Sequence, residues 1–328
     1  MNETSHLVQM VARLKDTPVL CVGDVMLDRF VYGSVDRISP EAPIPVLCIE
    51  REAAMLGGAG NVVRNVVAVG AAPAFVSVVG DDAAGHEVAR LLGEHCGIDP
   101  CIVVDAGRQT TIKTRFFASA QQLLRADQET TSRLSDAVGG KLLARAGELL
   151  PTVKAAAISD YGKGVLAMPI VAELIQRARA RGLPVVVDPK GEDYAIYRGA
   201  TVLTPNRKEL RLATKMPVDD DAGIIAAARH LIATCGMEAV LVTRSQDGMT
   251  LVTAAGAVDH LPAEAREVYD VSGAGDTALA GLVLALTSGS GLEEAAHFAN
   301  AAAGVVVAKL GTATVSPAEL LDHVSHAP

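Results

Sequence analysis

The chain has 328 residues, half of them apolar but only 3% aromatic, and its net charge at pH 7 is −9. This length suits one large α/β domain, and a core of Ala, Val, Leu and Ile is typical of parallel strands buried on both faces. The acidic balance argues against a nucleic-acid partner, and no apolar run reaches the roughly 18 residues of a membrane span. Five cysteines without a CxxC pair indicate reduced thiols in a cytoplasmic protein.

The first half of the chain predicts a mixture of elements. A mixed-charge amphipathic stretch opens it, and a buried strand over Val19–Val25 carries Asp24 near its end. The other elements expected here are helices at Ala59–Val69, Gly85–Glu94 and Arg133–Leu150 and strands at Pro73–Val79 and Ala155–Ser159. Two extended segments, about 31–56 and 108–127, do not fit this alternation and predict a small separate β-sheet, a lid inserted in a single domain spanning 1–328.

The second half alternates regularly between strands and helices. The expected elements are helices at Ile170–Arg181 and Ala222–Thr234, strands at Pro184–Asp188, Thr201–Leu203 and Ala239–Thr243, and extended pieces at Met249–Thr253 and 258–262. Short connections between such elements predict right-handed crossovers and a mostly parallel sheet. Ligands bind at the carboxyl ends of parallel strands, and polar residues gather at those ends in this sequence.

The turn Gly273-Ala274-Gly275-Asp276 is the most informative motif. It precedes an apolar helix expected at Thr277–Leu286. Two glycines allow a sharp turn, and the free N–H groups of a helix N-terminus form an anion site. Asp276 is either a cap of this helix or a base beside a bound phosphate, and the motif alone favours neither.

The same turn also fits G-x-G-x-x-A, the dinucleotide fingerprint, which would make the chain a nicotinamide-dependent oxidoreductase. The fit is weak because this fingerprint belongs on the first βαβ unit and needs an acidic residue at the end of a second strand. The residues at that distance, Glu293 and Glu294, lie in helical surroundings.

Four further constellations have both a functional and a structural interpretation. Gly57-Gly58-Ala59-Gly60-Asn61 is either a ligand-binding turn or a plain loop before a helix. Asp28 is either a sugar ligand or the partner of Arg29 or Arg37. Asp188 and Lys190 either bind a ligand or pair with each other, and Asn206 with Glu209 forms either a capping box or part of a Mg²⁺-phosphate site.

Together these motifs resemble those of the ribokinase-like carbohydrate kinases. Asp-x-Ser-Gly-Ala-Gly-Asp-Thr, Gly-Gly-x-Gly-Asn and Asn-x-x-Glu occur in that family's order, and the resemblance spans roughly residues 16–320. Four longer segments of the sequence resemble those of the heptose-7-phosphate kinases of lipopolysaccharide core synthesis. The segments that resemble this group are 23–29, 38–46, 159–164 and 188–191. The implied fold is a three-layer α/β sandwich with a small β-sheet lid.

The resemblance implies phosphorylation of the anomeric C1 hydroxyl of D-glycero-D-manno-heptose 7-phosphate by ATP with Mg²⁺. Asp276 would be the general base, with Asp270 as its competitor, and the Gly273, Ala274 and Gly275 amides would form the anion hole. The residues implied at the nucleotide and Mg²⁺ are Asn206, Glu209, Thr243, Ser245, Gly248 and Asn300. The residues implied at the sugar are Asp28, Gly58 and Asn61, with Asp188 beside them and Arg115 and Lys190 as cations for its phosphate. Asp270 and Ser272 match a site for a monovalent cation such as K⁺.

The resemblance further implies the kinase alone, without the nucleotidyltransferase domain that follows in some members. The rivals are a kinase of another sugar or sugar phosphate, the oxidoreductase above, and a non-catalytic sugar-phosphate sensor. The exposed edges of a small lid sheet need cover, which predicts a homodimer through the lid.

Overall fold

The computed structural model of the chain describes residues 3–97, 101–119, 121–264, 269–309 and 311–325. The α-helices are α1 (Glu3–Leu14), α2 (Ala59–Ala68), α3 (Ala83–Cys96), α4 (Asp136–Leu149), α5 (Ile170–Arg179), α6 (Arg207–Thr214), α7 (Asp221–Cys235), α8 (Ala274–Thr287), α9 (Leu292–Val307) and α10 (Pro317–Ser325). The strands are β1 (Pro18–Gly23), β2 (Val25–Ile38), β3 (Pro45–Gly58), β4 (Ala72–Gly80), β5 (Cys101–Asp105), β6 (Thr111–Ala118), β7 (Gln121–Gln128), β8 (Ala156–Ser159), β9 (Val185–Asp188), β10 (Val202–Leu203), β11 (Ala239–Thr243), β12 (Met249–Thr253) and β13 (Val258–Leu261). None of the helices in these ranges is long and apolar enough to span a bilayer.

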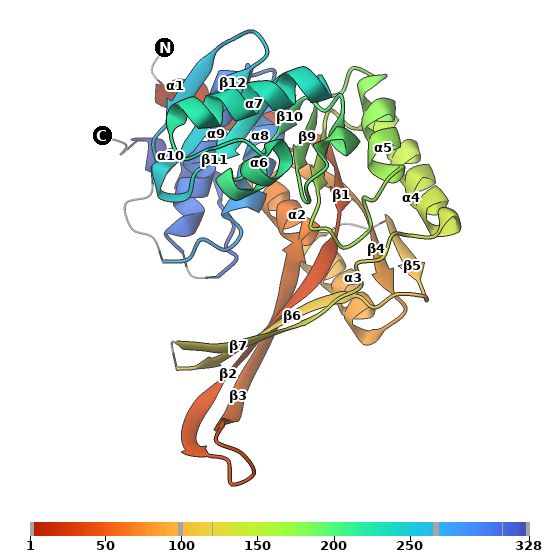
Figure 1. The fold of residues 1–328 in the computed structure, drawn as a ribbon, viewed down its shortest axis with the longest axis vertical. Coiled ribbons are helices and arrows are strands. Elements are labelled where there is room, and N and C mark those ends of the chain that lie inside the picture. The colour runs from red at the N-terminus through yellow and green to blue at the C-terminus, as the bar shows by residue number, and fades with distance from the viewer. Residues whose placement is uncertain (1–2, 98–100, 120, 265–268, 310, 326–328) are drawn as a thin grey trace.

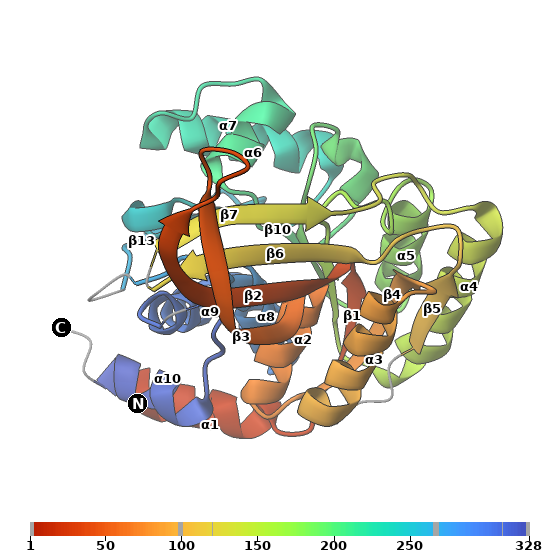
Figure 2. The ribbon, with the colours of Figure 1, turned by 90° about the horizontal axis from the view of Figure 1, so that it is seen from below.

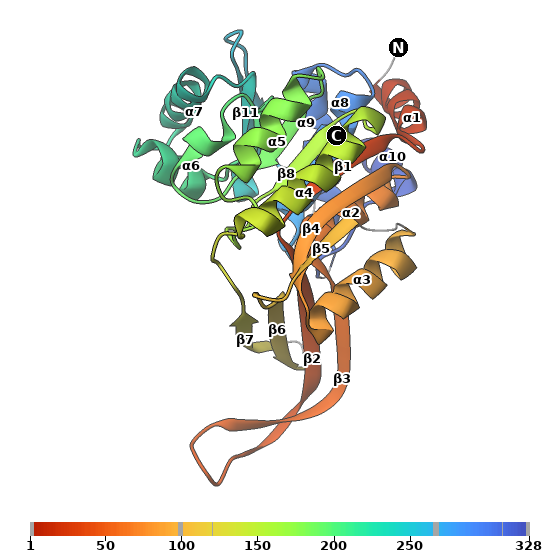
Figure 3. The same ribbon diagram turned by 90° about the vertical axis from the view of Figure 1, so that its right-hand side faces the viewer.

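A large sheet forms the middle layer of the molecule. Within the described residues it has nine strands in the order β13-β12-β11-β10-β9-β8-β1-β4-β5, and neighbouring strands pair parallel except in the pairs β11–β12 and β12–β13, which are antiparallel. Helices α4 to α7 pack on one face and the remaining helices on the other, which gives three layers (Figure 3). The fold confirms the predicted α/β sandwich.

Both faces of this sheet are buried, and β1 shows why its sequence is a continuous apolar run. Val19 and Cys21 belong to the core under one helical layer, whereas Leu20 and Val22 belong to the core under the other. Successive side chains of a strand point to opposite faces, so a strand covered on both sides needs apolar residues at every position.

The second sheet is small and projects from the three-layer body as a long arm (Figure 1). Its order is β3-β2-β6-β7, in which β2 pairs antiparallel with β3 and parallel with β6. Figure 2 looks onto this sheet, with the body behind it and α1 lying beside α10 at one side. The arm confirms the small second sheet that the two irregular segments predict.

Three local predictions need correction. The predicted strand over Val19–Val25 breaks at Asp24, and Val25 already belongs to the arm strand β2. Helix α8 begins at Ala274, earlier than the predicted Thr277, because the residues of the glycine turn form its first turn. The edge strand β5 (Cys101–Asp105) was not predicted; it pairs only with β4, and its exposed Val104 interrupts the buried pattern.

Candidate active site

The glycine turn places Asp276 in the first turn of α8. Gly273 caps the helix with φ 84°, and a Cβ atom there would lie 2.7 Å from Nδ2 of Asn61, so this position requires glycine. The Ala274 N–H donates to the Val271 carbonyl oxygen (3.3 Å), whereas the described residues offer the Gly275 N–H no acceptor. The helix therefore presents a free amide beside the Asp276 carboxylate.

The Asp276 side chain is buried, with 3% of the residue exposed, and both of its oxygens accept hydrogen bonds. Oδ2 accepts from Nδ2 of Asn61 (2.9 Å), and Oδ1 accepts from the hydroxyl of Tyr161 (2.8 Å). Burial raises the pKa of Asp276 to about 6, although these two hydrogen bonds act in the opposite direction. The carboxylate is therefore ionised at neutral pH and more basic than an ordinary aspartate.

Helix α2 lies against α8 and supplies Asn61. Gly58 caps α2 with φ 56°, and a Cβ atom there would lie 2.5 Å from the Asp24 carbonyl oxygen. Asn61 is fully buried, and its Oδ1 accepts from Nη1 of Arg64 (3.1 Å). Both polar ends of Asn61 are thus bonded to protein, one to Asp276 and one to Arg64.

Asp28 lies on β2, where the arm joins the body. Its residue is 3% exposed, and its Oδ1 accepts from Nη1 of Arg115 on β6 (2.8 Å). The alternative partners that the sequence suggested, Arg29 and Arg37, are wrong. The parallel pairing of β2 with β6 brings Arg115 beside Asp28, and the guanidinium also lies 5.3 Å from the ring centroid of Phe30.

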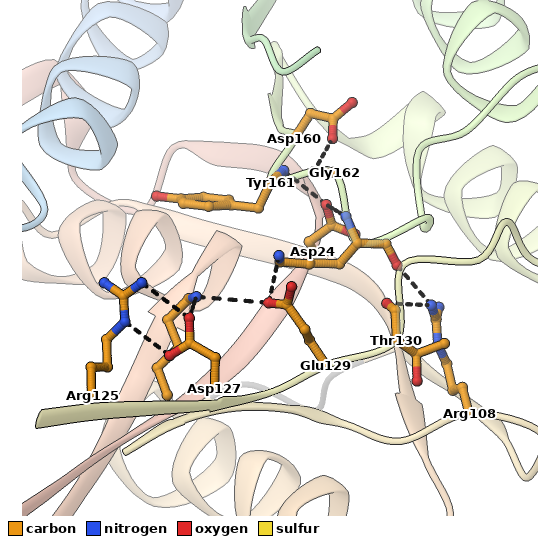
Figure 4. Close-up of polar contacts among 11 residues, drawn as sticks. Asp24, Arg108, Arg125, Asp127, Glu129, Thr130, Asp160, Tyr161 and Gly162 are labelled. Carbon is orange, nitrogen blue, oxygen red and sulfur yellow. Dashed lines mark hydrogen bonds and ion pairs between the residues drawn. The ribbon is translucent and has the colours of Figure 1, made fainter. Parts of the chain in front are cut away.

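A loop after β8 brings Tyr161 to the site, and the Asp24 carboxylate holds that loop (Figure 4). Asp24 accepts from the backbone N–H groups of Tyr161 (2.8 Å), Lys163 (3.0 Å) and Val165 (3.2 Å). Burial and the neighbouring Asp160 carboxylate raise the pKa of Asp24 to about 6.

Three ion pairs lie beside this loop. Lys163 pairs with Glu129 (2.6 Å) and Lys113 with Asp127 (3.0 Å), and Figure 4 shows the two acidic partners. Arg125 donates to the same Asp127 (2.9 Å). The Lys163–Glu129 pair therefore joins the end of the arm strand β7 to the loop after β8.

Asp188 and Lys190 do not pair with each other. Lys190 pairs with Oε1 of Glu209 (2.8 Å), while Oδ1 of Asp188 accepts from the Thr204 hydroxyl (3.2 Å). Asn206 and Glu209 form the capping box at the start of α6, because each side chain accepts from the other's backbone N–H. Burial and the carboxylates of Asp276 and Glu209 raise the pKa of Asp188.

A cavity of about 470 Å³ lies on the other side of the glycine turn. Of the residues predicted at the nucleotide, Thr243, Ser245, Gly248 and Asn300 line it, and Ala274 and Gly275 join it to the anion site. Its remaining walls are mostly small or apolar residues of α9 and the neighbouring segments. Asn300 is 3% exposed and donates to the Pro262 carbonyl (2.9 Å) and to Glu264 (3.0 Å).

Asp270 lies in a different environment from Asp276. Its Oδ1 accepts from the Ser272 N–H (2.8 Å) and its Oδ2 from the Gly311 N–H (3.1 Å). The carboxylate therefore joins two backbone segments.

Sequence reasoning missed two residues of this site, Tyr161 and Arg64. Each had a local signal: Tyr161 follows a predicted strand end, and Arg64 lies one helical turn after Asn61.

Comparisons with known proteins agree on one family. The sequence pattern of the pfkB family carbohydrate kinases matches residues 16–319. Bifunctional protein HldE of Paramagnetospirillum magneticum (strain ATCC 700264 / AMB-1) is 70% identical over 98% of this chain and 66% of that protein. Bifunctional protein HldE of Rhodospirillum rubrum is 56% identical over 98% of this chain and 65% of that protein. The chain thus spans just under two thirds of the length of these two relatives.

Solved structures show the same fold at low sequence identity. Phosphofructokinase-2 from Escherichia coli in complex with potassium has a TM-score of 0.78 and 19% identity, over 95% of this chain and 99% of that one. Arabidopsis thaliana ribokinase complexed with ribose and ATP has a TM-score of 0.70 and 21% identity, over 94% of this chain and 99% of that one. The chain has the ribokinase-like fold and belongs to the pfkB family of carbohydrate kinases.

Proposed function

We propose that the chain transfers the γ-phosphoryl group of ATP to the anomeric C1 hydroxyl of D-glycero-D-manno-heptose 7-phosphate. The product is the 1,7-bisphosphate, a precursor of ADP-heptose and of the lipopolysaccharide core. The observation that carries the phosphotransfer is the buried Asp276 carboxylate beside the free Gly275 amide, between the cavity and the Asp28–Arg115 pair. The heptose assignment is supported by the sequences of segments 23–29, 38–46, 159–164 and 188–191, which resemble those of the heptose-7-phosphate kinases.

In this reaction Asp276 accepts the proton of the C1 hydroxyl as its oxygen attacks the γ-phosphorus. The bond from that phosphorus to the β,γ-bridging oxygen breaks, and ADP leaves. The amides of Gly273, Ala274 and Gly275 stabilise the charge on the transferred group, Gly273 and Gly275 most directly because their N–H groups have no acceptor among the described residues. A pKa of about 6 suits Asp276 to proton transfer near neutral pH.

In this proposal, Mg²⁺ and the ATP phosphates bind beside Asp188, Lys190 and Glu209. The described residues contain no cluster of three or more metal-ligating side chains. Mg²⁺ does not need one, because it keeps several waters and takes one or two carboxylates together with phosphate oxygens. The proposal is supported by Asp188, whose pKa is raised by burial and by the neighbouring carboxylates of Asp276 and Glu209, because a bound cation would offset this repulsion. Glu209 would act through water, and bound Mg²⁺ would neutralise the phosphates.

The sugar belongs against Asp28, Gly58 and Asn61, with Arg115 as a cation for the 7-phosphate. Arg115 already binds a carboxylate oxygen through its guanidinium, whose geometry also suits phosphate. Lys190 fits the ATP phosphates better than the distal sugar phosphate, because it pairs with Glu209. Asp270 and Ser272 remain our candidates for a K⁺ site, which replacement of K⁺ by Na⁺ in the assay tests.

We also propose a homodimer through the arm. All eight residues of its edge strand β7 are exposed, and Leu124 is 59% exposed. A second copy would cover this edge and these apolar side chains. Sedimentation equilibrium of the wild type should give a dimer and Leu124→Lys a weaker one. A monomeric wild type would contradict the proposal.

The test of function measures ADP release from MgATP with heptose 7-phosphate, fructose 6-phosphate, ribose, adenosine and no sugar. We expect release with heptose 7-phosphate alone. Release with another sugar would keep the kinase chemistry and overturn the heptose assignment. Binding of sugar phosphate without any release would favour a sensor.

A further inference from the structure

The Asp276 carboxylate is held from two sides by residues that are distant in the sequence. We propose that Asn61, Arg64 and Tyr161 form a clamp that fixes the orientation of the base. This inference rests on the proposed phosphotransfer, and it assigns to Tyr161 and Arg64 an effect on turnover rather than on sugar affinity.

The first half of the clamp is one face of α2. Asn61, Arg64 and Asn65 are three and four residues apart, so they share the face that packs on α8. Asn61 donates to Oδ2 of Asp276, and Asn65 accepts from the Thr277 hydroxyl (3.1 Å). The two asparagines therefore bond to consecutive residues of the first turn of α8.

Arg64 fixes which way the Asn61 amide faces. An amide group can turn over and exchange its oxygen and nitrogen, which would point the oxygen at the carboxylate. The Arg64 guanidinium carries only donors, so its bond to Oδ1 of Asn61 keeps the NH₂ group toward Asp276. Arg64 itself also donates to the Thr312 carbonyl oxygen (3.0 Å).

The second half of the clamp is Tyr161, on the loop after β8. The loop does not depend on substrate for its position, because the Asp24 carboxylate accepts from three of its backbone N–H groups, of which Figure 4 shows that of Tyr161. The Tyr161 hydroxyl then reaches Oδ1 of Asp276. A carboxylate oxygen accepts about two hydrogen bonds, so Oδ1 and Oδ2 each keep one position for the incoming sugar hydroxyl.

Two consequences follow from this geometry. The side chain of Asp276 cannot rotate without losing both bonds, so the proton acceptor is oriented before the sugar arrives. The Asn61 amide keeps a second N–H for the sugar, because its NH₂ group has two donors and Asp276 takes one.

The experiment compares kcat and the sugar KM of Tyr161→Phe and Tyr194→Phe with those of the wild type. Tyr194→Phe is the matched control, because Tyr194 is also buried and its hydroxyl has no partner among the described residues. Tyr161→Phe should lower kcat on the order of 10- to 100-fold and change the sugar KM less than about threefold. The control should leave both unchanged. A normal kcat in Tyr161→Phe, or a raised sugar KM as its main effect, would overturn the clamp.

Arg64 tests the other half with a conservative rescue. Arg64→Met should lower kcat about 10-fold with little change in sugar KM, because the Asn61 amide is then free to turn over. Arg64→Lys keeps a donor for Oδ1 of Asn61 and should recover most of the loss. Equal losses in both variants would contradict the role given to this hydrogen bond.

A second measurement keeps the clamp separate from the identity of the substrate. Urea unfolding midpoints of wild type, Tyr161→Phe, Asp276→Ala and the double variant form a cycle that needs no activity. The midpoint shift caused by Tyr161→Phe should depend on whether residue 276 is Asp or Ala. Equal shifts in both backgrounds would overturn the clamp even if the kinase activity is as proposed. Coupled shifts in a protein that phosphorylates no sugar would refute the proposed function alone.

Discussion

The two sides of the Gly273–Asp276 turn are built differently. On the sugar side, the buried polar groups of Asp28, Asn61 and Asp276 all bind other side chains before any ligand arrives. On the nucleotide side, the cavity has small and apolar walls, and Asn300 is the buried polar residue among its described lining. In the proposed reaction, this difference provides orientation where the proton moves and space where the nucleotide binds. Substitutions on the sugar side should therefore affect turnover and sugar use, and those on the nucleotide side the KM for ATP.

The largest effect belongs to the base. Asp276→Asn should lower kcat about 10³-fold or more, because a general base contributes roughly 10²- to 10⁴-fold and the Asn61 amide would face another amide. Asp270→Asn tests the competing carboxylate, which accepts from the backbone N–H groups of Ser272 and Gly311. Steady-state kinetics of both variants would contradict the base assignment if Asp276→Asn stayed near full activity while Asp270→Asn lost it.

The next effect tests the arm side of the site. Asp28→Ala should lower kcat/KM for the sugar about 100-fold, because it removes a charge-assisted hydrogen bond and leaves Arg115 unpaired. The KM for ATP should not change. Asp219→Ala removes the carboxylate of an exposed pair with Arg211 and should have no effect. A rise in the KM for ATP of Asp28→Ala, with unaltered sugar kinetics, would contradict the proposal that Asp28 binds the sugar.

The sequence predicts the features that depend on neighbouring residues. The glycine turn, the helix behind it and most strands of the large sheet are visible because each depends on neighbouring residues and on simple apolar runs. The sequence does not predict the strand break at Asp24, because Val25 continues the apolar run of β1. In the structure Val25 pairs instead with Gly58 of the arm strand β3.

The contacts between side chains that are distant in the sequence could not be predicted. Asn61 and Asp276 are 215 positions apart, and Tyr161 and Asp276 are 115 apart. The Asp28–Arg115 pair depends on the register of β2 against β6, which no local pattern specifies. Only the fold shows that Asn61 donates a hydrogen bond to Asp276.

On the nucleotide side, Ala303→Leu should raise the KM for ATP about 10-fold, because the larger side chain would fill part of the cavity. The kcat at saturating ATP and the sugar KM should stay near wild type. Ala295 lies on the same helix and outside the cavity lining, so thermal unfolding of Ala295→Leu gives a reference for the cost of overpacking α9. A fall in kcat of Ala303→Leu without a change in ATP KM would argue against nucleotide binding here.

The smallest effect is a pH shift. Only the ionised Asp276 accepts a proton, so kcat at saturating substrates should fall about tenfold per pH unit once the pH drops below about 6. The Tyr161 hydrogen bond lowers this pKa, whereas burial and Asp28 raise it and Arg64 lowers it. Tyr161→Phe should therefore move the acidic limb of the kcat profile to higher pH. A shift to lower pH would contradict the hydrogen bond to the ionised base.

The central claim is phosphoryl transfer to the anomeric oxygen with Asp276 as the base. The most direct measurement is ³¹P NMR of heptose 7-phosphate incubated with MgATP and either the wild type or Asp276→Asn. The account predicts ADP and a new phosphate resonance coupled to the anomeric proton with the wild type, and neither over the same time with the variant. A phosphate on another carbon, or the same product formed by Asp276→Asn at the wild-type rate, would contradict it.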